Sequence, residues 1–185
     1  MQAARGASLT GDERPVSGPT GHRSRLGLIL AVAAAAWLLD IVTKVIVVHQ
    51  LGDEPVKVVG SLLQLHLTRN AGAAFSTGTS LTAAIAVFGC FAFLGVCWLT
   101  RRVGSTVWAW AFGLLLAGIG GNLTDRFFRS PGPLRGHVID FLELPHWPIF
   151  NVADVCINVA AALIVLQSVR GVGLSGRRDS AGTKP

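Results

Sequence analysis

Four apolar stretches constrain how this chain can fold more than any other feature of its sequence. They are Leu26–Val48, Leu81–Thr100, Thr106–Leu123 and Val152–Val169. A helix needs roughly 20 residues to cross ~30 Å of hydrocarbon, and each stretch comes close to that length. Of all residues 51% are hydrophobic and only 14% are charged, a balance typical of membrane proteins. The sequence therefore predicts an all-α membrane protein with four transmembrane helices.

Polar segments divide the chain around this membrane domain. Residues 1–25 and 170–185 are basic and contain few apolar residues, so we expect two disordered arms that flank one domain at 26–169. The first apolar stretch follows a polar arm and has no clear small-residue cleavage site, which favours a retained anchor helix over a cleaved signal peptide. Between the first two stretches, Val56–Gly60 and Leu62–Leu67 show the pattern of short strands. They predict a small extracytoplasmic β-sheet lying on the membrane.

The distribution of basic residues predicts the orientation in the membrane. The two termini and the Arg101–Arg102 turn hold ten Lys and Arg residues, whereas segments 49–80 and 124–151 hold five. The positive-inside rule then places both termini in the cytoplasm and both long connections outside, in the cytoplasmic (inner) membrane. Contacts with anionic lipid headgroups account for the net charge of +6. We therefore expect membrane lipids, and no nucleic acid, as partners.

Several kinds of chemistry lack support in the sequence. The three cysteines have no metal-ligand spacing and lie inside apolar stretches, at Cys90, Cys97 and Cys156. Three histidines have no partner spacing, namely His49, His66 and His146. No Gly-x-Ser-x-Gly or His-Glu-x-x-His motif occurs. We expect no metal, no cofactor and no covalent nucleophile.

Two aspartates are the strongest candidates for chemistry. Asp140 ends the run Gly-His-Val-Ile-Asp and Asp154 ends the run Phe-Asn-Val-Ala-Asp, each beside the fourth apolar stretch. A carboxylate at the edge of a membrane span is costly to keep, and is a functional-site hypothesis by default. Two carboxyls that share one site cannot both ionise easily, which suits acid and base catalysis. For Asp154 alone, a helix-capping role with Asn151 as N-cap is the structural alternative.

A second charged pair lies within the first apolar stretch. Asp40 and Lys44 are four residues apart and so share one face of the predicted helix. An ion pair that makes both charges tolerable in the membrane is the simplest interpretation. Lys44 can alternatively extend its ammonium group toward the membrane surface.

Two further motifs carry amides and an arginine. Asn70 lies among small residues beside Gly72, where its amide can approach an extended peptide or stabilise a turn. Asn122 and Arg126 are again four residues apart, after a glycine-rich helix segment that permits close approach. We interpret Asp125 as a structural partner. Helix-end capping remains the alternative for this group.

Taken in order, the motifs resemble one family. Asp40-x-x-x-Lys44, Asn70-x-Gly72-x-Ala74-Phe75, Gly121-Asn122-x-x-Asp125-Arg126, Gly136-His137-Val138-x-Asp140-Phe141 and Phe150-Asn151-x-Ala153-Asp154 are similar to the motifs of lipoprotein signal peptidase, or signal peptidase II. The resemblance covers residues 26 to 169. It implies four transmembrane helices, a small extracytoplasmic sheet, and aspartic-type cleavage of prolipoproteins just before the diacylglyceryl-modified cysteine.

The resemblance also implies roles for individual residues. Asp140 and Asp154 would form the catalytic dyad, in a monomer whose partners are prolipoprotein substrates and lipid. The residues that would position substrate or support the dyad are Asp40, Lys44, Asn70, Gly72, Asn122, Asp125, Arg126, His137, Asn151 and Ala153. The chain departs from the family pattern in the short loop between its two aspartates and in its polar arms.

Two other functions remain open at this point. A non-enzymatic four-helix protein, such as a proton-coupled channel or transporter subunit, also buries carboxylates along a polar path. The clustering of polar motifs near one membrane face disfavours it. A different intramembrane aspartyl protease is disfavoured because the sequence has no Gly-x-Gly-Asp motif.

Overall fold

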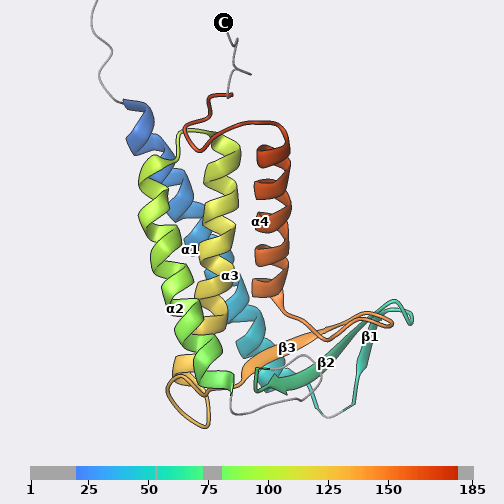
Figure 1. Cartoon of the computed structure of the whole chain (residues 1–185). Coiled ribbons are helices and arrows are strands. Elements are labelled where there is room, and N and C mark those ends of the chain that lie inside the picture. Colours follow the sequence, from blue (N-terminus) through green and yellow to red (C-terminus); the bar gives the residue numbers. More distant parts are fainter. Residues whose placement is uncertain (1–19, 53, 73–80, 179–185) are drawn as a thin grey trace, which may run out of the picture.

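Four long helices lie side by side, with a small sheet at one end of the bundle (Figure 1). The computed structural model describes residues 20–52, 54–72 and 81–178. Within them, all four helices are long and apolar enough to span a membrane, which confirms the predicted fold class. The helices are α1 (Thr20–Gln50), α2 (Thr82–Leu99), α3 (Thr106–Phe128) and α4 (Val152–Val169), with a short 3-10 turn, η2 (Thr100–Arg102), after α2.

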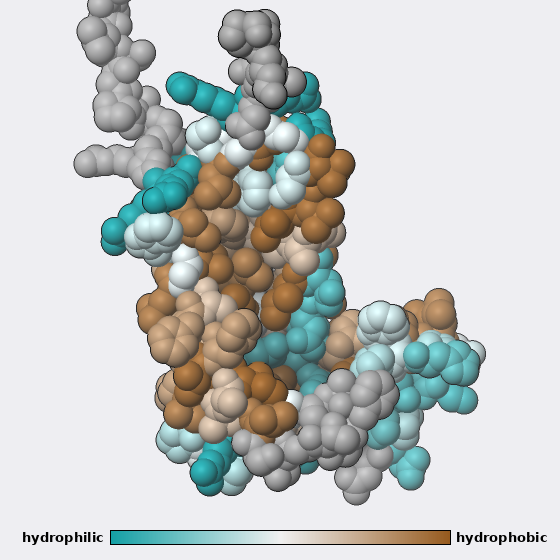
Figure 2. All heavy atoms as spheres, viewed as in Figure 1, coloured by the Kyte–Doolittle hydropathy of each residue, from teal (hydrophilic) through white to brown (hydrophobic). Residues whose placement is uncertain are grey.

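The surface of the bundle fits a membrane environment. Figure 2 shows hydrophobic residues over the middle of the helices, with hydrophilic residues at the end opposite the sheet and over the sheet itself. The start of α1, the α2–α3 connection and the end of α4 all lie at the end opposite the sheet (Figure 1). The chain is therefore a multi-pass membrane protein, and the Arg101–Arg102 turn lies at the same end of the bundle as the start of α1 and the end of α4.

Helix α3 forms the centre of the bundle. Of its apolar window 56% is buried, against 22% or less for the other three helices. Two glycines let its neighbours come close: a Cβ at Gly118 would lie 2.5 Å from the Ala153 carbonyl oxygen of α4, and one at Gly121 would collide with the Asp40 carboxylate of α1. These positions bring the polar residues of α1, α3 and α4 together.

The described residues also form a three-stranded antiparallel sheet in the order β1-β2-β3. β1 (Val56–Val59) and β2 (Leu63–Asn70) agree with the two predicted strands, whereas β3 (Val138–Glu143) was not predicted. Ile139 and Phe141 of β3 pack against Val47 of α1. Because side chains alternate along a strand, Asp140 lies on the other face of the sheet, away from Val47.

The described structure includes parts of both segments that we expect to be disordered arms. α1 begins at Thr20, inside the predicted N-terminal arm. In the predicted C-terminal arm, Trp108 Nε1 donates a hydrogen bond to the Val172 carbonyl at 3.0 Å, and Gly104 N donates to the Leu174 carbonyl. Residues 172 and 174 thus accept hydrogen bonds from the start of α3 and the turn before it, contacts that composition does not reveal. Residues 1–19 and 179–185 lie outside the described residues.

Candidate active site

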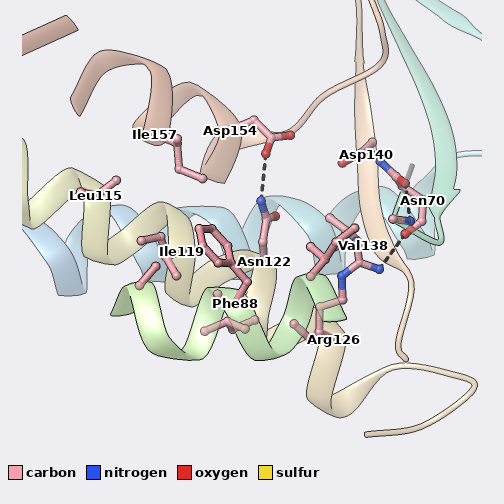
Figure 3. Close-up of a pocket in the computed structure, with 16 residues that line it drawn as sticks. Asn70, Phe88, Leu115, Ile119, Asn122, Arg126, Val138, Asp140, Asp154 and Ile157 are labelled. Atoms are coloured by element: carbon pink, nitrogen blue, oxygen red, sulfur yellow. Dashed lines mark hydrogen bonds between the residues drawn. The ribbon is translucent and has the colours of Figure 1, made fainter. Parts of the chain in front are cut away.

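Asp140 and Asp154 line the same pocket, although they come from a strand and a helix. The pocket has a volume of about 460 Å³ and lies between β2, β3 and the facing ends of α2, α3 and α4 (Figure 3). Its polar end holds the two carboxyls. Its apolar wall comes from α2, α3 and α4, and includes Phe88, Leu115, Ile119 and Ile157.

Two asparagines connect the carboxyls. Asn151 Nδ2 donates to Asp140 Oδ1 at 2.6 Å and to Asn122 Oδ1 at 3.2 Å. Asn122 Nδ2 in turn donates to Asp154 Oδ1 at 2.8 Å (Figure 3). A continuous chain of amide hydrogen bonds therefore runs from one carboxyl to the other and fixes their relative position.

Asp140 is held almost entirely by amide groups. Asn70 Nδ2 donates to its second oxygen at 2.9 Å, and the residue is only 3% exposed. Burial raises the pKa of Asp140 to about 6; the nearby negative charge of Asp154 also raises it, while the hydrogen bonds from Asn70 and Asn151 lower it. Asp140 is therefore a carboxyl that can hold a proton close to neutral pH.

Asp154 is half-buried at the start of α4. Asn151 is the N-cap: its side chain accepts a hydrogen bond from Asp154 N at 3.0 Å, and Asp154 Oδ2 accepts one from Asn151 N at 3.2 Å. This capping box is the structural role that the sequence offered as an alternative. Both roles hold together, because the carboxylate that caps the helix also faces the pocket.

A buried ion cluster lies behind the pocket. Lys44 Nζ is 2.8 Å from Asp40 Oδ2 and 2.8 Å from Asp125 Oδ2. The side chain of Lys44 is 1% exposed, so its alternative extension to the membrane surface was wrong. Asp40 also accepts a hydrogen bond from Ala153 N at 2.9 Å, and Asp125 accepts one from Ile139 N at 3.2 Å. The cluster thereby joins α1, α3, α4 and β3.

The ion cluster touches the carboxyl pair through one residue. Lys44 Nζ donates to Asn122 Oδ1 at 3.3 Å. An ammonium group can only donate, so the oxygen of the Asn122 amide must face Lys44 and its NH₂ group must face Asp154. The buried lysine thus sets the orientation of the amide that holds Asp154.

Arg126 contacts backbone carbonyls. Its Nη1 donates to the Asn70 carbonyl at 3.2 Å and to the Gly136 carbonyl at 2.9 Å. These bonds hold the end of β2 and the turn before β3 against α3. Gly72 permits this arrangement: its φ is +118°, and a Cβ there would lie 3.3 Å from Arg126 Nη2. Arg126 lines the pocket, as does Gly72.

His137 is a predicted site residue that does not line the pocket of Asp140 and Asp154. It lines a separate pocket together with Ile139, whereas Val138 and Asp140 line the pocket of the two carboxyls. The alternation of side chains along an extended chain explains this difference. The three-residue spacing between His137 and Asp140 therefore does not place them together.

The apolar wall from α2 was missed by the sequence analysis. Ala86, Gly89 and Ala92 line the pocket at intervals of three residues. Small residues at that spacing on one face of a helix mark a surface open to close approach. That signal was visible in the sequence.

Within the described residues, no group of three or more His, Cys, Asp or Glu side chains is arranged to hold a metal ion. The pocket instead combines two carboxyls with neutral amides and an apolar wall. Such an arrangement can activate a water molecule by proton transfer and can accept an apolar substrate beside it.

Comparison with known proteins places this arrangement in a family. The family described as Signal peptidase (SPase) II matches residues 32–170. The chain belongs to the signal peptidase II family. Relatives named lipoprotein signal peptidase include one from Mycobacterium avium (strain 104), 45% identical over 175 residues that cover 93% of this chain and 94% of the relative. Another, from Leifsonia xyli subsp. xyli, is 44% identical over 180 residues, covering 95% of this chain and 83% of the relative.

Two solved structures share the fold. One, a bacterial membrane enzyme determined by the in meso method at 2.3 Å, has a TM-score of 0.71 and 21% identity, and the match covers 85% of this chain and 96% of that one. A second, at 1.9 Å, has a TM-score of 0.70 and 24% identity, with 78% and 94% coverage. As a signal peptidase II family member the chain is a protease, which decides against the non-enzymatic channel or transporter subunit.

Proposed function

We propose that this signal peptidase II family member removes the signal peptide from diacylglyceryl-modified prolipoproteins, with Asp140 and Asp154 as the catalytic pair. The observation that carries the proposal is the amide chain from Asp140 through Asn151 and Asn122 to Asp154. It holds two carboxyls at one pocket through neutral groups. The names of the relatives support the substrate class.

The raised pKa of Asp140 indicates how the pair divides its work. Asp140 holds the proton and Asp154, at the positive end of the α4 dipole, is the base. Asp154 takes a proton from a water molecule as the water oxygen bonds to the scissile carbonyl carbon. Asp140 gives its proton to the carbonyl oxygen.

The second step returns the pair to its starting state. The tetrahedral intermediate collapses as the C–N bond breaks, the leaving amine takes the proton from Asp154, and the gem-diol returns a proton to Asp140. One water is consumed in the whole reaction and no covalent intermediate forms. The amides of Asn70 and Asn151 keep Asp140 in place during both transfers.

The apolar wall of the pocket suits a substrate that arrives from lipid. Phe88 is 73% exposed on α2 beside the pocket, and Gly89 leaves space next to Leu123. The acyl chains and the signal peptide remain in the hydrocarbon while the scissile bond reaches the carboxyls at the sheet. The basic segments at the other end of the bundle support cytoplasmic termini and an active site at the outer face of the cytoplasmic membrane.

The proposal is tested by cleavage of a diacylglyceryl prolipoprotein by the purified full chain. Asp154→Asn should lower turnover by at least about 10³-fold, because it removes a general base. Glu143→Gln is the matched control, since Glu143 lies on β3 but pairs with His66 away from the pocket. Turnover within tenfold of wild type by Asp154→Asn would refute the assignment of the pair.

A further inference from the structure

A second pocket lies on the opposite face of the strands that carry the active site. Its volume is about 470 Å³. It is lined by the end of α3, the turn that follows, and the face of β2 and β3 that carries Arg69 and Ile139. The lining residues are Arg69, Phe128, Arg129, Ser130, Pro131, His137 and Ile139.

The register of the sheet explains why the two pockets are separate. Arg69 pairs with Ile139 across β2 and β3, whereas Thr68 pairs with Asp140. Paired residues project to the same face, and adjacent residues project to opposite faces. Arg69 therefore faces the second pocket, and the catalytic pair lies behind the sheet.

The second pocket is cationic. Arg69 is exposed, and its side chain makes no hydrogen bond or ion pair with any residue in 25–52, 54–72 or 81–178. Arg129 uses Nε to contact Asp125, and keeps its two terminal nitrogens for a further ligand. Asp125 is itself shared with Lys44. No acidic side chain lines the pocket among these residues, so the charge of Arg69 has no counter-ion there.

The pocket also lies where a helix leaves the membrane. At 1.5 Å per residue the 23 residues of α3 cover roughly 35 Å, slightly more than the ~30 Å hydrocarbon core. Phe128 is the last residue of α3 and is 85% exposed. An aromatic ring at the edge of a span and basic side chains beside it match the apolar and the anionic parts of a lipid headgroup region.

We propose that this pocket binds the phosphate group of an anionic phospholipid in the leaflet beside the sheet. Arg69 and the terminal nitrogens of Arg129 contact the phosphate oxygens, the Ser130 hydroxyl and the His137 ring add hydrogen-bond donors, and Phe128 contacts the glycerol and acyl region. The inference does not depend on the role of Asp140 and Asp154. It assigns His137 a function apart from the catalytic pair.

The experiment measures lipid retained by the purified full chain from bilayers of equal parts phosphatidylcholine and phosphatidylglycerol, by native mass spectrometry. We expect preferential retention of phosphatidylglycerol, and a loss of about fivefold in Arg69→Gln. Arg135→Gln is the matched control, because Arg135 is exposed in the same connection but does not line the pocket. Equal losses in the two variants, or no preference between the lipids, would overturn the proposal.

A second arm distinguishes the source of the phosphate. Inorganic phosphate, added at constant ionic strength, should displace the retained phosphatidylglycerol from the wild-type chain more effectively than chloride does. A double variant with Arg69→Gln and His137→Gln should retain less than Arg69→Gln alone. Binding of inorganic phosphate with no dependence on the lipid present would contradict a phospholipid site, as would equal displacement by an unlipidated acidic peptide.

Discussion

Two pairs of carboxyls lie close together in this protein, and their partners differ. Asp40 and Asp125 both bind the ammonium group of Lys44, at 2.8 Å each. Asp140 and Asp154 are instead held by asparagine amides and face a pocket. A cation fixes the charge of a carboxylate, whereas a neutral amide fixes its position and leaves its proton free to move. The comparison separates a structural pair from a pair suited to catalysis.

The two pairs of carboxyls also differ in the free energy that their burial costs. Charges within a membrane domain are tolerated when they are paired and hydrogen-bonded. The ion cluster meets this condition through Lys44, Ala153 N and Ile139 N. No cationic side chain of the described residues bonds to Asp140, and burial raises its pKa to about 6. A buried carboxyl with a raised pKa lowers the stability of the folded protein at neutral pH, whereas a carboxylate paired with a cation does not.

The largest effect on stability is expected from the removal of the shared cation. Lys44→Met leaves Asp40 and Asp125 buried without a counter-ion, which should cost about 3–5 kcal/mol of unfolding free energy. The matched control is Lys57→Met, on the exposed strand β1. Unfolding in one detergent measures both. Adding Asp40→Asn and Asp125→Asn to Lys44→Met should restore much of the loss, and failure to do so would show that packing and not charge is responsible.

A smaller effect, of opposite sign, is expected at Asp140. Its pKa is raised in the folded chain from 3.8 to about 6, so its stabilising contribution is complete below about pH 4 and is lost as the pH rises through 6. The wild type should therefore lose up to about 3 kcal/mol relative to Asp140→Asn across that range. The difference is measured by unfolding both proteins at about pH 4 and at neutral pH. A difference that does not change with pH would show that Asp140 has an ordinary pKa.

The smallest of these effects concerns the amide between the two clusters. Asn122→Ala removes the hydrogen bond to Asp154 and the contact with Lys44, at a cost of about 1–3 kcal/mol. That corresponds to a loss of roughly five- to 150-fold in kcat/KM. Asn158→Ala is the control, because the Asn158 side chain is exposed and donates to the Asp154 backbone carbonyl rather than to its carboxylate. Similar kinetics in the two variants would remove Asn122 from the positioning of Asp154.

The sequence predicted the parts of this comparison that depend on local pattern. The helices follow from the length of the apolar stretches, and the pair of Asp40 and Lys44 follows from helical spacing. The contact of Lys44 with Asp125 could not be predicted, because the two residues lie on different helices and share no periodicity. The closeness of Asp140 to Asp154 was inferred from motif order, and their connection through Asn151 required the structure.

The strand β3 explains most of the remaining differences. Val138–Glu143 is short and is buried over its first four residues, so it lacks the polar alternation that marks an exposed strand. Without that strand, the family resemblance implied that His137 positions substrate or supports the dyad. The alternation along the chain places His137 and Asp140 on opposite faces of the sheet, so each lines a different pocket.

The central claim is that the amide-held pair performs catalysis while the lysine-held pair maintains the fold. The most direct test measures prolipoprotein cleavage per folded molecule and unfolding for two matched variants, Asp140→Asn and Asp125→Asn. We predict that Asp140→Asn loses at least about 10³-fold in turnover and is at least as stable as the wild type at neutral pH. Asp125→Asn should lose stability and retain most of its turnover per folded molecule. Wild-type turnover by Asp140→Asn, with loss of turnover in a stable Asp125→Asn, would contradict the account.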